Sequence, residues 1–182
     1  MAGILKVDKY QDFNGNDIMT SDGSGNLTLN NSALKNTPAF EAVRTTTLSL
    51  STSTNTAVVA DTENLDTDSA YDTSTGYFTP QVAGKYYIYS ATCFNTYNGS
   101  FDRLDGLVYL RIRKNGSNVK ENVYDGRNSA NGTQITLTIS AIVELNGSTD
   151  YVDFSIESSI SSTGTTTNDT KPIIGGYKLI GA

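Results

Sequence analysis

Apolar and polar residues alternate along several stretches of the chain. In QITLTISAIVEL, residues 134–145, the apolar positions of one face are Ile135, Leu137, Ile139, Ala141, Val143 and Leu145. The same alternation occurs in LVYLRIR, with Val108, Leu110 and Ile112, and in YVDFSIE, with Val152, Phe154 and Ile156. Successive side chains of a strand point to opposite faces, so this period predicts strands with one face buried. No window repeats apolar residues at a spacing of three and four, and the chain is therefore predicted to be all-β.

Asn-Gly pairs mark the ends of these predicted strands. Asn115–Gly116 and Asn146–Gly147 directly follow two of them, and Asn131–Gly132 precedes a third. Such pairs readily take the positive φ that a tight hairpin needs, so we expect antiparallel neighbours. Many strands joined by turns, without intervening helices, predict a two-sheet antiparallel sandwich or jelly roll.

The stretch GKYYIYSATCF, residues 84–94, is apolar on both of its faces. We predict that Tyr86, Ile88 and Phe94 face the interior and that Tyr87, Tyr89 and Cys93 face the opposite way. A strand of this kind needs cover on both sides, and a neighbouring subunit can supply the second cover. Tyrosine suits such a contact because it combines a large apolar area with a hydroxyl. The alternative is that Tyr87 and Tyr89 lie under a loop of the same subunit.

The composition changes near Pro38. Residues 1–37 are rich in Asn, Asp, Gly and Ser, and they are too short and too glycine-rich to hold a core, so we predict an irregular attachment segment there. Its apolar positions Ile4, Leu5, Val7 and Tyr10 are the predicted anchoring residues. Residues 38–182 form the predicted jelly-roll domain.

The net charge and the amino-acid composition argue against several classes of function. The net charge of −6 and the scattered basic residues argue against nucleic acid as a partner. No apolar run approaches the roughly 20 residues that cross a bilayer, and the first residues lack the hydrophobic core of a signal peptide, so we expect synthesis in the cytoplasm and no membrane partner. With one cysteine and no histidine, the chain has no internal disulfide, no Cys-rich zinc site and no histidine-based triad. We predict no cofactor.

Carboxylates gather in two places. DTENLDTD carries Asp61, Glu63, Asp66 and Asp68, which offer oxygens to calcium, but Leu65 and the missing glycine break the EF-hand pattern, and a solvated acidic loop is the simpler interpretation. FDRLDG, with Asp102 and Asp105, is a weaker case of the same kind. Asp150 and Asp153 stand three apart on a strand and point to opposite faces, so they cannot flank one glycosidic bond. A hydrolase is disfavoured, and we predict a protein without enzymatic activity.

The order of the motifs PAFEAVR, GYFTPQVAGKYYIYSATC, DYVDFSI and IIGGYKLIGA resembles the globular head of complement component one, subcomponent q, and its tumour-necrosis-factor-like relatives. The matching positions are Phe40, Ala42, Gly76, Phe78, Thr79, Pro80, Gly84, Tyr86, Gly176 and Tyr177. The resemblance covers roughly Pro38 to Ala182 and implies a trimeric ten-strand jelly roll. Tyr87, Tyr89 and Tyr177 are the predicted trimer-interface residues.

The N-terminal stretch LKVDKYQDFNGNDIMTSDGSGNLTL resembles a lead-in of structural proteins of tailed bacteriophages, especially marine ones. Taken with the trimeric head, this resemblance implies a virion structural protein, either a capsid decoration or a short fibre or tail-associated protein, with other virion proteins as partners. The alternative is a receptor-binding or host-glycan-binding adhesin head that uses loops such as NTYNGSFDRLDG.

Overall fold

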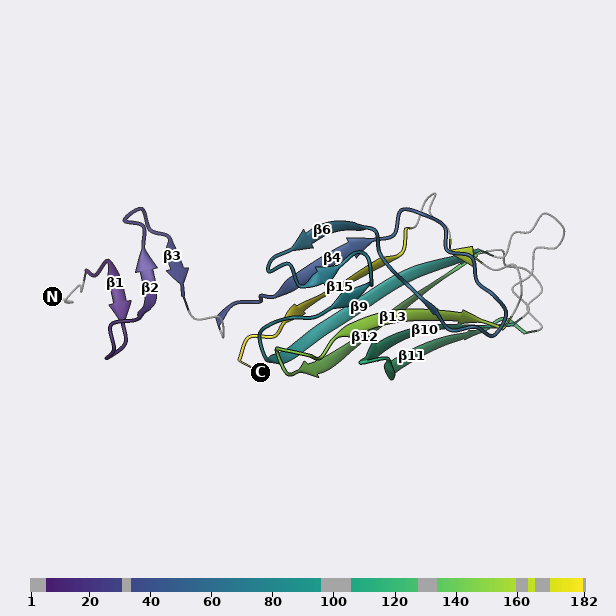
Figure 1. Ribbon diagram of the computed structural model, residues 1–182. Helices are drawn as coiled ribbons and strands as arrows, with labels where there is room; N and C mark the ends of the chain where they lie inside the picture. The colour runs from purple at the N-terminus through teal and green to yellow at the C-terminus, as the bar shows by residue number, and fades with distance from the viewer. Residues whose placement is uncertain are drawn as a thin grey trace.

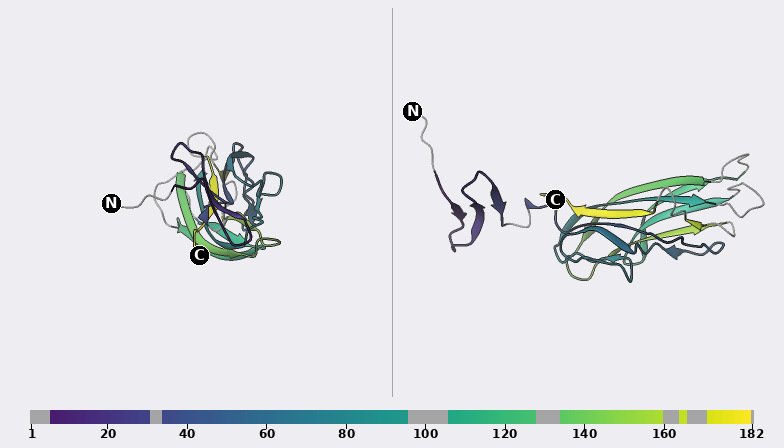
Figure 2. Two further views of the ribbon diagram at one scale, coloured as in Figure 1. Left: turned by 90° about the vertical axis from the view of Figure 1, so that its left-hand side faces the viewer. Right: turned by 90° about the horizontal axis from the view of Figure 1, so that it is seen from above.

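The chain forms a sandwich of two antiparallel sheets, with a small third sheet on its N-terminal side (Figure 1). The computed structural model describes residues 6–30, 34–95, 106–127, 134–159, 164–165 and 171–181. The C terminus lies at the end of the sandwich where the N-terminal segment joins it (Figure 2). Among the described residues there is no helix long and apolar enough to span a membrane.

The first large sheet has the strand order β12-β9-β15-β4-β6. Its strands are β12 (Gln134–Leu145), β9 (Gly84–Asn95), β15 (Ile173–Lys178), β4 (Ala39–Val43) and β6 (Thr62–Asp66), and β14 (Gly164–Thr165) pairs with β9. Strands β9 and β12 pair along their whole length, from Gly84 opposite Leu145 to Asn95 opposite Gln134. The two stretches with the clearest strand patterns, residues 84–94 and 134–145, therefore pair with each other in one sheet.

The second large sheet has the order β11-β10-β13-β8-β7. Its strands are β11 (Ser117–Asp125), β10 (Leu107–Lys114), β13 (Val152–Ser158), β8 (Tyr77–Phe78) and β7 (Tyr71–Asp72), and β5 (Thr56–Ala57) pairs with β13. The chain crosses from the first sheet to the second between β9 and β10, returns between β11 and β12, and crosses again between β12 and β13. These crossings make the sandwich a jelly roll, as the sequence predicted.

The core lies between the two sheets, where the alternation placed it. The inward residues of β9, β10 and β13 are all buried: Tyr86, Ile88, Phe94, Val108, Leu110, Ile112, Val152, Phe154 and Ile156. Aromatic rings join the layers, since Phe40 of β4 stacks on Phe78 of β8 with ring centroids 4.3 Å apart and on Tyr71 of β7 at 5.0 Å. The Tyr71 hydroxyl donates to the carbonyl oxygen of Ala60 at 3.2 Å and accepts from its amide at 3.0 Å. Burial raises the pKa of Tyr71 to about 12.

The two described Asn-Gly pairs have different roles. Asn115 and Gly116 both have positive φ, 52° and 78°, and they join β10 to its neighbour β11, as expected of a hairpin. The expectation of a hairpin at Asn146–Gly147 is wrong, because β12 and β13 lie in different sheets. Gly147 has φ +70°, and a Cβ there would lie 2.2 Å from the amide nitrogen of Ala83, so this turn is a close packing point between connections. Asn131–Gly132 lies outside the described residues.

The N-terminal segment is more regular than predicted. It contains the strands β1 (Lys9–Gln11), β2 (Asp17–Ser21) and β3 (Leu27–Leu29), which form an antiparallel meander that we call the N-terminal sheet. Asp12 and Asp22 set the two turns, because each carboxylate accepts hydrogen bonds from amides of its own turn. Composition predicted an irregular chain from these Asp, Asn and Gly residues, whereas they specify tight turns between short strands.

Candidate interaction surface

The outward face of the first sheet carries rows of residues that the strand register sets side by side. The first row runs Ile142, Tyr87, Tyr177 and Ala39, across β12, β9, β15 and β4. The second row runs Ser140, Tyr89, Gly175, Glu41 and Leu65, and reaches the edge strand β6. We call the surface around Tyr87, Tyr89 and Tyr177 the tyrosine face. It lies opposite the core on the same strands, so β9 carries large apolar side chains on both of its faces.

Tyr89 lies flat over a glycine. Gly175 is its direct neighbour on β15, and a Cβ on Gly175 would come within 2.5 Å of the Tyr89 Cζ and Oη atoms. Because Gly175 has no side chain, the ring reaches across β15 to β4, where its hydroxyl donates to Glu41 Oε2 at 2.7 Å. Burial, followed by the hydrogen bond and charge of Glu41, raises the pKa of Tyr89 above its usual 10. Tyr89 is therefore held in one position.

Tyr87 and Tyr177 form the exposed centre of the tyrosine face. Their ring centroids are 5.6 Å apart, and those of Tyr87 and Tyr89 are 6.2 Å apart. Tyr177 is 36% exposed and Ile142, on the other side of Tyr87, is 60% exposed. Tyr87 is half-buried between these two exposed side chains.

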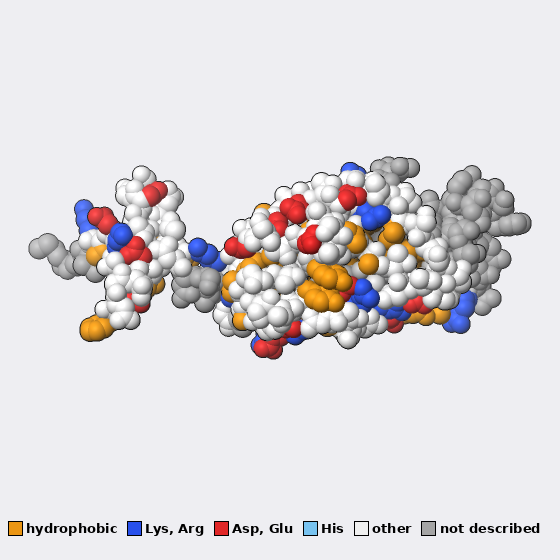
Figure 3. Space-filling view, viewed as in Figure 1, with side chains coloured by type: hydrophobic (Ala, Val, Ile, Leu, Met, Phe, Trp, Pro, Cys, Tyr) orange, Lys and Arg blue, Asp and Glu red, His pale blue; other side chains and the backbone are white. Residues whose placement is uncertain are grey.

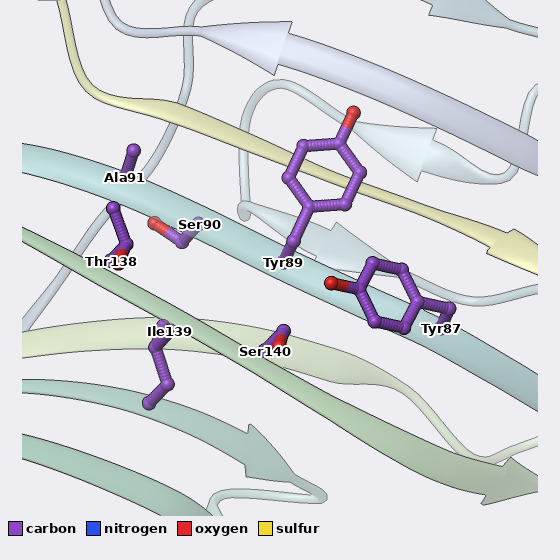
Figure 4. Close-up of a pocket in the computed structure, with 7 residues that line it drawn as sticks. All are labelled: Tyr87, Tyr89, Ser90, Ala91, Thr138, Ile139 and Ser140. Atoms are coloured by element: carbon purple, nitrogen blue, oxygen red, sulfur yellow. The ribbon is translucent and has the colours of Figure 1, made fainter.

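A shallow trough runs between β9 and β12 on this face (Figure 4). Its volume is about 370 Å³, and Tyr87, Tyr89 and Ala91 line it on β9 while Thr138 and Ser140 line it on β12. Figure 3 shows hydrophobic side chains gathered over β9 and β15, with acidic side chains on the side of β4 and β6. The apolar centre and its acidic border give the surface a defined shape and polarity.

The outward face of the second sheet is different, because ion pairs occupy it. Arg111 Nε lies 2.5 Å from Glu121 Oε2, and Arg111 Nη1 lies 2.7 Å from Glu157 Oε2. Arg113 pairs with Asp153, a carboxyl that is 2% exposed and whose pKa is raised by burial. These charges are paired within the chain, although Arg113 Nε and Asp153 Oδ1 are buried without a hydrogen-bond partner among the described residues. This face therefore carries paired charges where the first sheet carries tyrosines.

The structure brings together all three of the predicted interface residues. Tyr87 and Tyr89 point away from the core, as predicted, and Tyr177 joins them from β15. Of the predicted anchoring residues, Tyr10 is exposed on β1 and Val7 is exposed just before it, while Ile4 and Leu5 lie outside the described residues. Sequence reasoning missed Glu41, Gly175 and Ile142. Ile142 carried a signal, since it is the one apolar residue on the otherwise polar face of QITLTISAIVEL.

Carboxylates of the acidic stretch DTENLDTD accept hydrogen bonds from neighbouring segments of the head. Asp61 accepts hydrogen bonds from the amide and hydroxyl of Thr45, and Asp66 accepts from the amides of Ala70 and Tyr71. Among the described residues, no three or more acidic or cysteine side chains are grouped so that they could hold a metal ion. Asp102 and Asp105 lie outside the described residues.

The carboxylates of Asp150 and Asp153 have separate partners. Asp150 Oδ2 lies 2.8 Å from Lys114 Nζ, whereas Asp153 pairs with Arg113. Each carboxylate therefore has a structural role of its own. The premise that both lie on one strand is wrong, because β13 begins at Val152 and Asp150 belongs to the turn before it.

These features define a class of protein: a two-sheet jelly roll of the tumour-necrosis-factor-like kind, with an aromatic face on one sheet. The family model of the C1q domain matches residues 39–177, most of the chain, and the chain belongs to the C1q domain family. Domains of this kind often form trimeric binding heads and are typically non-enzymatic. None of the curated proteins matches the chain.

Solved structures give the same fold. The globular domain of zebrafish complement 1qA protein is similar with a TM-score of 0.57 and 17% identity, over 78% of this chain and 97% of that chain. Murine APRIL at pH 5.0 is similar with a TM-score of 0.57 and 12% identity, over 78% of this chain and 98% of that chain. At such identities the likeness concerns the fold.

Proposed function

We propose that this chain is a non-enzymatic protein that assembles into a homotrimer through the tyrosine face and presents its head on a phage particle. The observation that carries the proposal is the uncovered row of Ile142, Tyr87 and Tyr177 on a sheet whose other side is already core. Burial of apolar area drives such association, and aromatic residues are enriched at interfaces.

The contribution of one tyrosine shows the scale. A fully buried aromatic side chain covers roughly 200 Å², so the 36% of Tyr177 that is exposed corresponds to about 70 Å² and about 2 kcal/mol per subunit. Three copies of Tyr177 then contribute about 5 kcal/mol, or between three and four orders of magnitude in the association constant. Ile142 and Tyr87 add to this contribution, which offsets part of the free-energy cost of bringing the subunits together.

A pair of matched variants tests the trimer. Tyr177→Glu places three carboxylates at the contact, and we expect it to convert the trimer to single chains at micromolar concentration. Tyr77 is the control, because it is also 36% exposed but lies on β8 of the second sheet, where it stacks on Tyr151 at 4.1 Å. Tyr77→Glu should keep the trimer. If both variants have the mass of the unchanged protein, the tyrosine face is not the interface.

The particle role rests on the N-terminal segment. Its resemblance to phage lead-in sequences motivates the assignment, and it joins the sandwich at one end (Figure 2). Deleting residues 1–37 should leave a folded head that no longer enters virions. Undiminished incorporation, measured by labelling particles with an antibody to the head, would contradict this part of the proposal.

A second candidate function is a receptor-binding or host-glycan-binding head. Membership of a family whose domains often form binding heads favours it. Most of NTYNGSFDRLDG, residues 96–105, lies outside the described residues, so the structure does not assign its loop a role. Saturable binding of the purified protein to host cells or surface polysaccharide would support the adhesin, and the absence of binding would favour a purely structural role.

A further inference from the structure

The N-terminal sheet has one polar and one apolar face. On the polar face, Asp17 accepts hydrogen bonds from Lys9 Nζ at 2.8 Å and from Gln11 Nε2 at 2.6 Å. On the other face the register places Tyr10 opposite Met19 and Met19 opposite Leu29. A shift in register between Tyr10 and Gln11 keeps Asp17 on the side of Lys9. Lys9 and Asp17 are thereby paired with each other.

The apolar face has no cover. Tyr10 is 55% exposed and Leu27 is 64% exposed. With Val7 and Met19 they line a hollow of about 100 Å³, to which Asp8, Lys9 and Ser21 also contribute. Strands of three, five and three residues do not form a stable sheet in water unless an apolar face is packed against something. This face therefore needs a partner whenever the sheet is formed.

The turns fix the shape that the partner must fit. Asp12 and Asp22 stand ten residues apart, and each uses Oδ1 to accept the amides two and four residues later, at 2.7 to 3.1 Å. Each also uses Oδ2 to accept the side-chain amide of an asparagine four residues later, Asn16 at 2.8 Å and Asn26 at 2.6 Å. The two turns have the same design, so the meander has a defined register and its apolar residues have fixed positions.

The strand register of the head indicates which partner can cover the apolar face of the N-terminal sheet. Ala39, the first residue of β4, is the direct neighbour of Tyr177 on the tyrosine face. Each N-terminal segment thus joins the head beside the proposed interface, and the chain from Leu29 to Ala39 spans at most roughly 35 Å. In a trimer held by the tyrosine face, two sister N-terminal sheets are within reach, at an effective concentration in the millimolar range.

We propose that the three N-terminal sheets of one trimer close around its axis with their apolar faces inward, as a short three-walled stalk. The inference rests on the trimeric head proposed above. Three equivalent sheets, each with one apolar face, form a closed arrangement in which no apolar face remains in water. Tyr10 and Val7 then contact sister chains, and the fully exposed Phe13 in the first turn stays free to contact a particle.

Single cysteines on neighbouring residues test the stalk. Tyr10→Cys places a thiol on the apolar face, and Lys9→Cys places one on the opposite face of the same strand; Cys93 is buried and common to both variants. Under mild oxidation of the purified trimer, Tyr10→Cys should give about tenfold more disulfide-linked dimer than Lys9→Cys, because a disulfide forms only between Cα atoms within roughly 7 Å. Leu27→Cys and Thr28→Cys repeat the comparison on β3.

The outcomes separate the stalk from the trimer. A trimer that cross-links preferentially through Tyr10→Cys and Leu27→Cys supports the stalk. A trimer with equal or negligible cross-linking at both faces overturns the stalk and leaves the trimeric head standing. A single-chain mass for the unmodified protein overturns both.

Discussion

Substituting Gly175 by alanine should dislodge Tyr89 from the tyrosine face without touching the core. The new Cβ would lie 2.5 Å from the Tyr89 ring, which is too close for the ring to stay. The ring would move out, and the hydrogen bond from its hydroxyl to Glu41, now 2.7 Å long, would be lost. The variant therefore measures how much the fixed position of Tyr89 contributes.

The expected change in stability follows from two opposing effects. Losing a hydrogen bond to a charged group, together with part of the buried ring, costs about 2 to 3 kcal/mol. Replacing glycine by alanine in a strand returns about 0.5 to 1 kcal/mol, since the unfolded chain has less freedom. Gly175→Ala should thus lower the free energy of unfolding by about 1 to 2.5 kcal/mol.

A double-mutant cycle gives the assay. In a Tyr89→Ala background the obstruction is absent, so Gly175→Ala should be neutral or stabilising by about 0.5 to 1 kcal/mol. Urea denaturation of all four proteins at one chain concentration measures the difference. Alkaline titration of tyrosine absorbance should also show that the pKa of Tyr89, raised by burial and by Glu41, falls toward 10 in Gly175→Ala. An equal loss of stability in both backgrounds would refute the packing of Tyr89 on Gly175.

Three further predictions concern the head and the N-terminal sheet. Tyr71→Phe removes a hydroxyl that serves both backbone groups of Ala60, so denaturant unfolding should show a loss of about 1 to 3 kcal/mol, and no loss would contradict the contact. Gly147→Ala should cost about 2 kcal/mol or more by thermal or urea unfolding, because the position has φ +70° and its Cβ would meet the backbone of Ala83; a neutral variant would refute that packing. Hydrogen bonds in its turn lower the pKa of Asp12 below its usual 3.8, so the carboxylate supports the turn above that pH and the support is lost as the pH falls through the lowered pKa. NMR signals of the turn should therefore be stable at neutral pH and collapse only in strong acid, and a transition above pH 3.8 would contradict the sign.

The large sheets could be predicted from the sequence because each of their long strands carries its own period. The inward and outward residues of β9 and β12 follow directly from alternation, and the outward tyrosines of β9 follow from the same rule. The role of Tyr177 was predicted from the motif IIGGYKLIGA at the end of the chain. These are local properties of ten to twelve consecutive residues, and tertiary packing did not override them.

The contacts that hold the tyrosine face could not be predicted in this way. Glu41 and Tyr89 are 48 residues apart, and nothing in either segment specifies that the register of β15 brings them together. The sequence around Gly175 does not indicate why a glycine is needed there, because the reason is the Tyr89 ring that packs on it from another strand. The hairpin expected at Asn146–Gly147 failed for a related reason, because an Asn-Gly turn specifies local geometry but not the sheet in which the next strand pairs.

The N-terminal sheet shows that amino-acid composition alone can mispredict local structure. Asp, Asn and Gly are typical of loops by composition, yet here the side chains of Asp12 and Asp22 close two turns around short strands. Two similar turn sequences, DFNGN and DGSGN, stand ten residues apart, and this spacing indicates short strands between turns. Composition alone does not contain that spacing.

The molar mass of the purified chain in solution tests the central claim most directly. If subunits associate through Ile142, Tyr87 and Tyr177, light scattering at micromolar concentration should give about 58 kDa, three times the chain mass of 19.5 kDa. A monodisperse species of 19.5 kDa would contradict the account, because it would mean that the tyrosine face is stable in water without a partner.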